Sequence, residues 1–181
     1  MKLTGGTLRG RTLPGRARPN THPTAARVRE ALFSMAGQDL IGVSVLDAFG
    51  GTGMLAFEAV SRGAELAWVI ERDGGAVRQI RRSAEVLGVA DRVLVRRGST
   101  PKDVPPGSFG LILLDPPYAL DPSAVLAAVA PRVDADGLVV LEHTAARAAP
   151  DLADFQADTR RYGDTALTLY RRLGTPPEPG S

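Results

Sequence analysis

Four consecutive residues, Asp115-Pro116-Pro117-Tyr118, combine groups that could hold and activate a planar amine. The Asp115 carboxylate accepts hydrogen bonds, and the two prolines lack N–H groups and have a fixed φ, so the carbonyls beside them are stiff acceptors with few competing donors. The Tyr118 ring offers a flat face for stacking. These groups suit a planar ligand with an exocyclic amino group whose nitrogen acts as a nucleophile. The alternative is structural: the prolines end a strand and Tyr118 caps the core.

The motif directly follows an apolar run, residues 109–114, which has the length and composition of a buried parallel strand. Before this run, residues 100–107 contain three prolines and are predicted to form a loop. The motif is therefore expected at the carboxyl end of a strand, where open α/β sheets bind their ligands.

A glycine-rich turn lies upstream in the segment Asp47-Ala48-Phe49-Gly50-Gly51-Thr52-Gly53. A predicted strand, residues 43–48, leads into it, and a predicted helix, residues 53–62, follows; this order is typical of the first βα unit of a nucleotide-binding sheet. A phosphate-binding P-loop would need Lys and then Ser or Thr after the last glycine. Met54 and Leu55 stand there instead, which excludes a P-loop.

Two cofactors remain compatible with this turn. Gly51, Gly53 and Ala56 fit a dinucleotide-binding pattern, and Glu71 follows Gly51 by 20 positions, as a ribose-binding acid would. Asp47 argues against a dinucleotide, because a carboxylate at the turn would repel a pyrophosphate and attract a cation. S-adenosylmethionine carries a sulfonium and an α-ammonium group and no phosphate. The acids therefore favour S-adenosylmethionine, with Glu71 on its ribose.

The order of these motifs resembles that of class I S-adenosylmethionine-dependent amino-methyltransferases. Residues 6–13 and 23–33 narrow the resemblance to the bacterial RsmD family, and residues 162–170 are also similar to that family. The resemblance covers roughly residues 3–172. It implies methyl transfer to the exocyclic N2 of a guanine in 16S ribosomal RNA. An adenine N6 amine is the alternative target, since the motifs themselves fit any exocyclic amine.

The chain departs from the family pattern in two places. His22-Pro23-Thr24 stands where the family commonly has Arg-Pro-Thr, and Ser99 stands near the end of the third strand, where Asp or Asn is often found. The predicted catalytic residues are Asp115, Pro116, Pro117 and Tyr118. The predicted cofactor-binding residues are Asp47, Phe49, Gly50, Gly51, Thr52, Gly53, Glu71, Arg72 and Ser99.

The net charge of +2 is unevenly distributed along the chain. Residues 1–29 contain seven basic and no acidic residues, whereas the remainder contains 15 basic and 20 acidic residues. A basic segment on an acidic domain is expected for binding to a phosphate backbone, and Arg can also stack on bases. The alternative is a solvated leader in an arginine-rich chain. The predicted RNA-binding residues are Arg9, Arg11, Arg16, Arg18, His22, Thr24, Arg27 and Arg29.

Predicted strands and helices alternate from residue 43 onward, which favours a doubly wound α/β sheet. The last two strands are separated by Gly163-Asp164 and are expected to form an antiparallel hairpin at the sheet edge. We expect a basic N-terminal hairpin and helix (1–36), a Rossmann-like methyltransferase domain (37–173) and a disordered tail (174–181). The predicted strands are 43–48, 66–71, 92–97, 109–114, 137–142, 155–161 and 165–171, and the predicted helices are 24–36, 53–62, 75–87 and 122–130.

The absence of cysteine limits the possible chemistry. It excludes disulfides and cysteine metal sites, and the presence of only two histidines argues against a histidine metal site. Methylation of a pyrimidine C5 by a cysteine nucleophile is excluded, whereas an amine needs no covalent intermediate. No transmembrane run or signal peptide is recognisable. We expect a monomeric cytoplasmic enzyme acting on 16S ribosomal RNA or the assembling small subunit; a nicotinamide-dependent oxidoreductase and a non-catalytic RNA-binding module are the alternatives.

Overall fold

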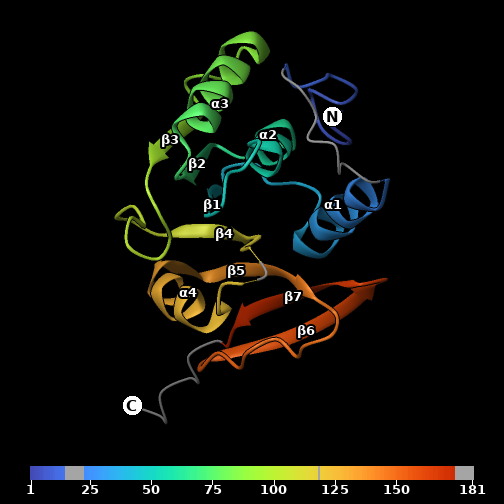
Figure 1. Cartoon of the computed structure of the whole chain (residues 1–181), viewed down its shortest axis with the longest axis vertical. Coiled ribbons are helices and arrows are strands. Elements are labelled where there is room, and N and C mark those ends of the chain that lie inside the picture. The colour runs from blue at the N-terminus through green and yellow to red at the C-terminus, as the bar shows by residue number, and fades with distance from the viewer. Residues whose placement is uncertain (15–22, 118, 174–181) are drawn as a thin grey trace, which may run out of the picture.

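Seven strands form one sheet in the order β3-β2-β1-β4-β5-β7-β6, with helices on both of its faces (Figure 1). The computed structural model describes residues 1–14, 23–117 and 119–173, except for the side chains of residues 23–25. The strands are β1 (Ser44–Asp47), β2 (Leu66–Glu71), β3 (Val93–Arg97), β4 (Phe109–Leu114), β5 (Val133–Thr144), β6 (Phe155–Tyr162) and β7 (Thr165–Arg172). The helices are α1 (Pro23–Ala36), α2 (Met54–Ser61), α3 (Gly74–Leu87), α4 (Pro122–Val129) and the short 3-10 helix η1 (Ala130–Arg132).

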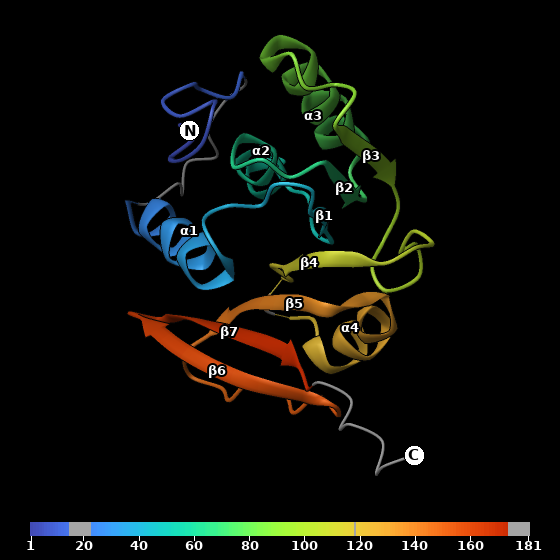
Figure 2. The ribbon, with the colours of Figure 1, turned by 180° about the vertical axis from the view of Figure 1, so that it is seen from behind.

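The first five strands are parallel, and β7 and β6 complete the sheet as an antiparallel hairpin. Figure 2 shows this hairpin beyond β5, at the end of the sheet opposite to β3. The predicted fold class and the predicted C-terminal hairpin are confirmed. The strand order reverses between β1 and β4, so their carboxyl ends flank the crevice in which sheets of this type bind ligands.

One predicted strand was too short. β5 begins at Val133 rather than at residue 137, because a register shift between Phe109 and Leu111 lets β4 pair with this earlier segment. This earlier start could not be predicted from the sequence, because Ala135 and Asp136 are exposed and do not continue the apolar pattern of the strand. β5 also ends two residues later than predicted, at Thr144 rather than at residue 142, and the ends of the other elements agree with the structure to within one residue.

Alternate residues of the central strands pack on opposite faces of the sheet. Val45, Val69 and Leu113 belong to a core with α1, α2 and α3, whereas Leu46 and Ile112 belong to a second core with α4. Both faces are therefore buried, as expected for parallel strands whose crossover helices cover the sheet. Within the described part of the chain, no helix has the length and apolar character needed to cross a bilayer.

The N-terminal segment packs onto the first of these cores, beside α2 (Figure 1). Its two ends pair in the predicted hairpin, in which the Leu3 N–H donates to the Arg11 carbonyl at 3.0 Å and Lys2 bridges to Thr12. Leu3 and Leu13 are almost fully buried. Since α1 joins the same core, the predicted boundary at residue 36 does not separate two hydrophobic cores.

Candidate active site at the carboxyl ends of the strands

The two predicted motifs meet in one cavity at the carboxyl ends of β1, β2, β3, β4 and β5. Its volume of about 1030 Å³ is at the upper end of the usual range for ligand pockets, roughly 300–1,000 Å³. The predicted residues that line it are Phe49, Gly51, Glu71, Arg72, Ser99, Asp115, Pro116 and Pro117. The sheet thus brings together segments that lie far apart in the sequence.

The glycine turn is shaped by its backbone. Gly51 and Gly53 have positive φ values of 52° and 77°, and a Cβ at Gly53 would lie 2.9 Å from the Phe57 ring. The Gly50 N–H donates to the Ile70 carbonyl at 2.8 Å, which holds the turn against β2. Gly50, Thr52 and Gly53 therefore form the turn, although only Gly51 of its glycines lines the cavity.

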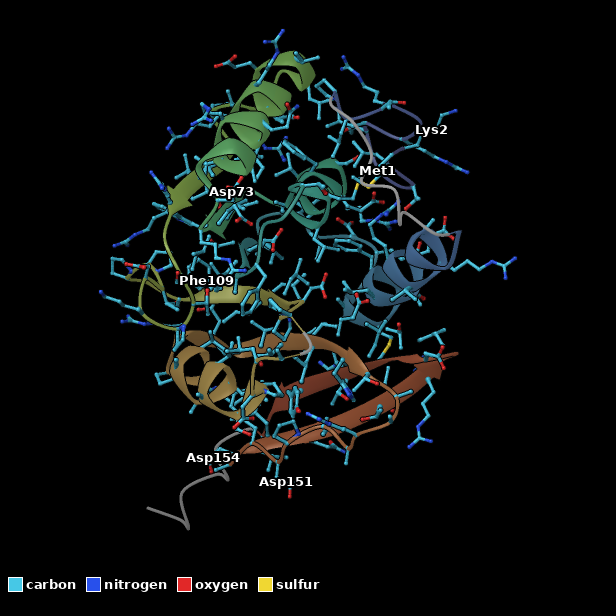
Figure 3. All side chains as sticks on the ribbon, in the orientation of Figure 1. Met1, Lys2, Asp73, Phe109, Asp151 and Asp154 are labelled. Atoms are coloured by element: carbon cyan, nitrogen blue, oxygen red, sulfur yellow. The ribbon has the colours of Figure 1, made fainter. Side chains whose placement is uncertain are left out.

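Glu71 connects the turn after β1 to the turn after β2. Its Oε2 accepts a hydrogen bond from the Gly51 N–H at 2.7 Å, and its Oε1 accepts one from the Asp73 N–H, also at 2.7 Å. Asp73, labelled in Figure 3, lies where β2 passes into α3 and caps that helix by accepting from the Ala76 N–H. Each Glu71 oxygen keeps a second lone pair for a ligand, and the residue is half-buried in the cavity wall.

Asp47 lies beneath the turn and does not line the cavity. It is 1% exposed; its Oδ1 accepts from the Phe49 N–H at 3.3 Å, while its Oδ2 is buried without a partner. Burial raises the pKa of Asp47 to about 7, the backbone N–H groups of Phe49 and Ala56 oppose the rise, and the charges of Asp115 and Glu71 add to it. An orphaned buried carboxylate oxygen is costly, so a cation or donor above the turn would be favoured.

Sequence reasoning missed Glu142, which lies beside the catalytic motif. Leu114 pairs with Leu141 in the parallel register, so the next residues, Asp115 just after β4 and Glu142 within β5, lie side by side. Burial, and then the charge of Asp115, raises the pKa of Glu142 to about 7. Asp115 is open to solvent, but the surrounding cleft partly desolvates its carboxyl and raises its pKa as well. An acid directly after an apolar run was the available signal, as for Glu71 and Asp115.

Four acids thus surround the ends of four strands: Asp47, Glu71, Asp115 and Glu142. Among the described residues, no group of three or more His, Asp or Glu side chains could hold a metal ion. Acidic groups in a concave site create a negative potential that attracts cations. The arrangement fits an organic cation better than a metal or a polyphosphate.

Ser99 lines the same cavity from the loop after β3. Its N–H donates to the Asp103 carboxylate at 2.8 Å, and the neighbouring Thr100 hydroxyl donates to the Ala48 carbonyl at 2.7 Å. The first bond stabilises the loop internally, and the second attaches it to the end of β1. Arg72, the next residue after Glu71, also lines the cavity.

A second cavity, of about 420 Å³, adjoins the first on the side of α4. The two share a wall that contains Pro116, Pro117 and Glu142. The second cavity also includes His143, and its remaining wall comes from the start of α4 and from residues 144–150. The two cavities therefore meet at Pro116, Pro117 and Glu142.

The structure changes the predicted RNA-binding set in one respect. Arg9, Arg11 and Arg27 are exposed, as that prediction requires. Arg29 is buried instead: its Nε lies 3.5 Å from Glu58 Oε2, and it donates to the Lys2 carbonyl at 2.9 Å. Arg29 therefore holds the N-terminal segment and is not available to a phosphate. Tyr118, Arg16, Arg18, His22 and the Thr24 side chain lie outside the described residues.

Comparisons with known proteins give a consistent result. A family model described as conserved hypothetical protein 95 matches residues 1–171. The chain is 29% identical to "Putative rRNA methyltransferase YlbH" of Bacillus subtilis over 184 residues, which cover 96% of this chain and 100% of that protein. It is 32% identical to ribosomal RNA small subunit methyltransferase D of Escherichia coli over 119 residues, 65% of this chain and 60% of that protein. The solved structure of "Putative methyltransferase yhhF" from Escherichia coli is similar at a TM-score of 0.86 and 25% identity, covering 97% of this chain and 99% of the other.

Proposed function

The chain belongs to the conserved hypothetical protein 95 family, and on that premise we propose that it transfers a methyl group from S-adenosyl-L-methionine to the exocyclic N2 amine of a guanine in 16S ribosomal RNA. One observation carries the proposal: the Gly51–Glu71 contact and the Asp115-Pro116-Pro117 segment face the same cavity. A cofactor pocket and a set of amine acceptors are thus joined, as a methyl transfer between two ligands requires.

The cofactor fits the residues of the first cavity. Glu71 has free lone pairs for the ribose hydroxyls, and the negative charge of the surrounding acids suits a sulfonium and an ammonium group. The unpartnered Oδ2 of Asp47 lies beneath the same turn and adds to this potential. When bound, S-adenosyl-L-methionine supplies an electrophilic methyl group.

The residues after β4 position the amine. Asp115 and the Pro116 carbonyl would accept the two N2 hydrogens, so that the nitrogen lone pair faces the methyl group; Tyr118 would stack on the ring. Fixed acceptors that replace water stabilise the charge that develops on the nitrogen. Asp115, whose pKa is raised by partial desolvation, is the group placed to take the proton that leaves after transfer. The exposed Arg9 and Arg11 would bind RNA phosphates.

Two measurements test the proposal. Calorimetry should show that S-adenosyl-L-methionine binds in the micromolar range or tighter, about −8 kcal/mol. Nucleoside mass analysis of 16S ribosomal RNA, naked or in small subunits, should then show N2-methylguanosine. N6-methyladenosine would instead select the adenine alternative, and tight binding of NAD without binding of S-adenosyl-L-methionine would reject a methyltransferase. We further propose that the protein acts as a monomer in the cytoplasm.

A further inference from the structure

Glu142 occupies the boundary between the two cavities. It lines both of them, together with Pro116 and Pro117, on the wall that they share. The first cavity contains Glu71 and the glycine turn, and the second contains neither. A side chain at this boundary can touch whatever lies in the second cavity while staying beside Asp115.

The residue after Glu142 is held in place by a chain of hydrogen bonds across three strands. His143 Nδ1 lies 3.0 Å from the Thr144 carbonyl, which can only accept, so Nδ1 is the donor in this contact. Nε2 lies 2.9 Å from the Thr168 hydroxyl of β7, which in turn lies 2.8 Å from the Thr159 hydroxyl of β6. This chain fixes the end of β5 and therefore the position of Glu142.

The second cavity has the composition expected of a pocket for a nucleotide base. Pro116, Pro117 and Leu120 provide flat apolar surface, and Glu142 provides a polar group at one side. Arg147 also lines the cavity and is exposed, so it can reach a phosphate outside it. Single-stranded bases are commonly bound in this manner, stacked on side chains and read along one edge.

We propose that this second cavity receives the target guanine, and that Glu142 accepts a hydrogen bond from its N1–H and thereby selects guanine over adenine. The inference rests on the function proposed above and names the residue that determines its specificity. Guanine presents two neighbouring donors, N1–H and the N2 amine, which match two neighbouring carboxyls. Adenine presents a bare N1 acceptor beside its amine, and the Glu142 carboxylate would repel that lone pair.

The ionisation of Glu142 is compatible with this role. Its pKa of about 7 leaves the carboxylate form available at pH 8, and a donated hydrogen bond from N1–H would favour that form further. The charged groups that face it are Asp115 from β4, Asp121 at the start of α4 and Arg147 from the loop after β5. Assays of the proposal are best made at pH 8.

Glu142→Gln tests the contact, with Glu85→Gln on the exposed face of α3 as the matched control. The kcat/KM for guanine methylation of 16S ribosomal RNA should fall roughly 10- to 150-fold in Glu142→Gln, which loses a charge-assisted hydrogen bond, and should be unchanged in the control. Both variants should bind S-adenosyl-L-methionine. If Glu142→Gln folds but cannot bind the cofactor, Glu142 serves the first cavity and the proposal is wrong.

A specificity switch provides a result that a merely structural role would not produce. In 2-aminopurine the N2 amine is kept, but N1 is an acceptor without a hydrogen. An RNA carrying 2-aminopurine at the mapped target position should be a poor substrate for the wild-type protein. In Glu142→Gln, whose amide can donate to N1, the preference for guanine over 2-aminopurine should shrink at least about 10-fold.

The results distinguish a failure of the proposed function from a failure of the proposed role of Glu142. A wild-type protein that forms no N2-methylguanosine overturns the proposed function and this inference together. A wild-type protein that forms it, while Glu142→Gln keeps the same rate and the same preference, overturns only the inference. Glu142→Asp, which keeps the charge on a shorter side chain, should retain more guanine activity than Glu142→Gln; equal loss in both would also count against the contact.

Discussion

Glu71 accepts a hydrogen bond from the Gly51 N–H at 2.7 Å, and this contact joins the ends of β1 and β2 across the floor of the candidate active site. The same carboxylate also accepts from the Asp73 N–H. A residue predicted only as a ribose ligand therefore also shapes the turn that it faces. Its two roles can be measured separately.

Glu71→Gln should weaken the binding of S-adenosyl-L-methionine, because a neutral amide replaces a carboxylate that would accept two ribose hydroxyls. The loss should be about 1.5–3 kcal/mol, roughly a factor of 10–150 in Kd. Calorimetric titration measures it, with Glu65→Gln at the opposite, exposed end of β2 as control. Equal affinities in the two variants would remove Glu71 from the cofactor site.

Asp115→Asn should abolish most turnover and leave cofactor affinity nearly unchanged, since this residue touches the amine in the proposed mechanism. Loss of the carboxylate charge, which stabilises the developing cation and takes the departing proton, should lower the single-turnover rate on the order of 10²-fold or more. Asp136→Asn, an exposed substitution at the far end of β5, provides the control. Near-normal methylation by Asp115→Asn would show that the reaction does not need the charge of this carboxylate.

Asp47 should make the stability of the free protein decrease with pH. Its pKa in the folded state, about 7, lies above the ordinary value of 3.8, so the folded state holds the proton more tightly than the unfolded state. The resulting stabilisation is complete below about pH 4 and is lost as pH rises to 7. Urea unfolding at pH 5 and pH 8 should show a smaller decrease in Asp47→Asn. Asp115 and Glu142, whose pKa values are also raised, should account for part of what remains.

Glu58→Ala should destabilise the protein by about 3–5 kcal/mol, because it leaves the buried guanidinium of Arg29 without its partner. Glu58 is fully buried and also binds the Thr4 N–H, the Thr4 hydroxyl and Arg62. Thermal unfolding measures the loss, and Glu85→Ala on the surface of α3 should have little effect. A small loss in Glu58→Ala would mean that the segment is held mainly by its other contacts, which include the buried Leu3 and the hydrogen bonds to Ser61.

Substitution of Arg9, Arg11, Arg16 and Arg18 by Gln should weaken RNA binding and flatten its salt dependence. Each lost phosphate contact should reduce the slope of log K against log salt by about 0.7–0.9. Binding of S-adenosyl-L-methionine should persist, since none of the four belongs to its site. Arg160→Gln with Arg161→Gln, on the exposed strand β6, is the control. An unchanged slope would identify the segment as a solvated leader.

The sequence was most informative where a feature is local. The apolar run before Asp115, the glycines around Gly51 and the spacing to Glu71 each follow from a few neighbouring residues, and the sheet brings them together as expected for parallel strand ends. Local patterns of this kind could not predict that Arg29 is buried or that Glu142 lies beside Asp115. The partner of Arg29 is 29 positions away in a different helix, and the role of Glu142 depends on which strand lies next to β4.

The contact between Thr4 and Glu58 also has a consequence for the order of events during protein synthesis. The two residues are 54 positions apart, so the ribosome needs about 3–10 s to add the second after the first. Throughout this interval the helix on which the arginine-rich N-terminal segment packs has not yet been completed. The N-terminal segment can therefore reach its native position only after α2 has been made.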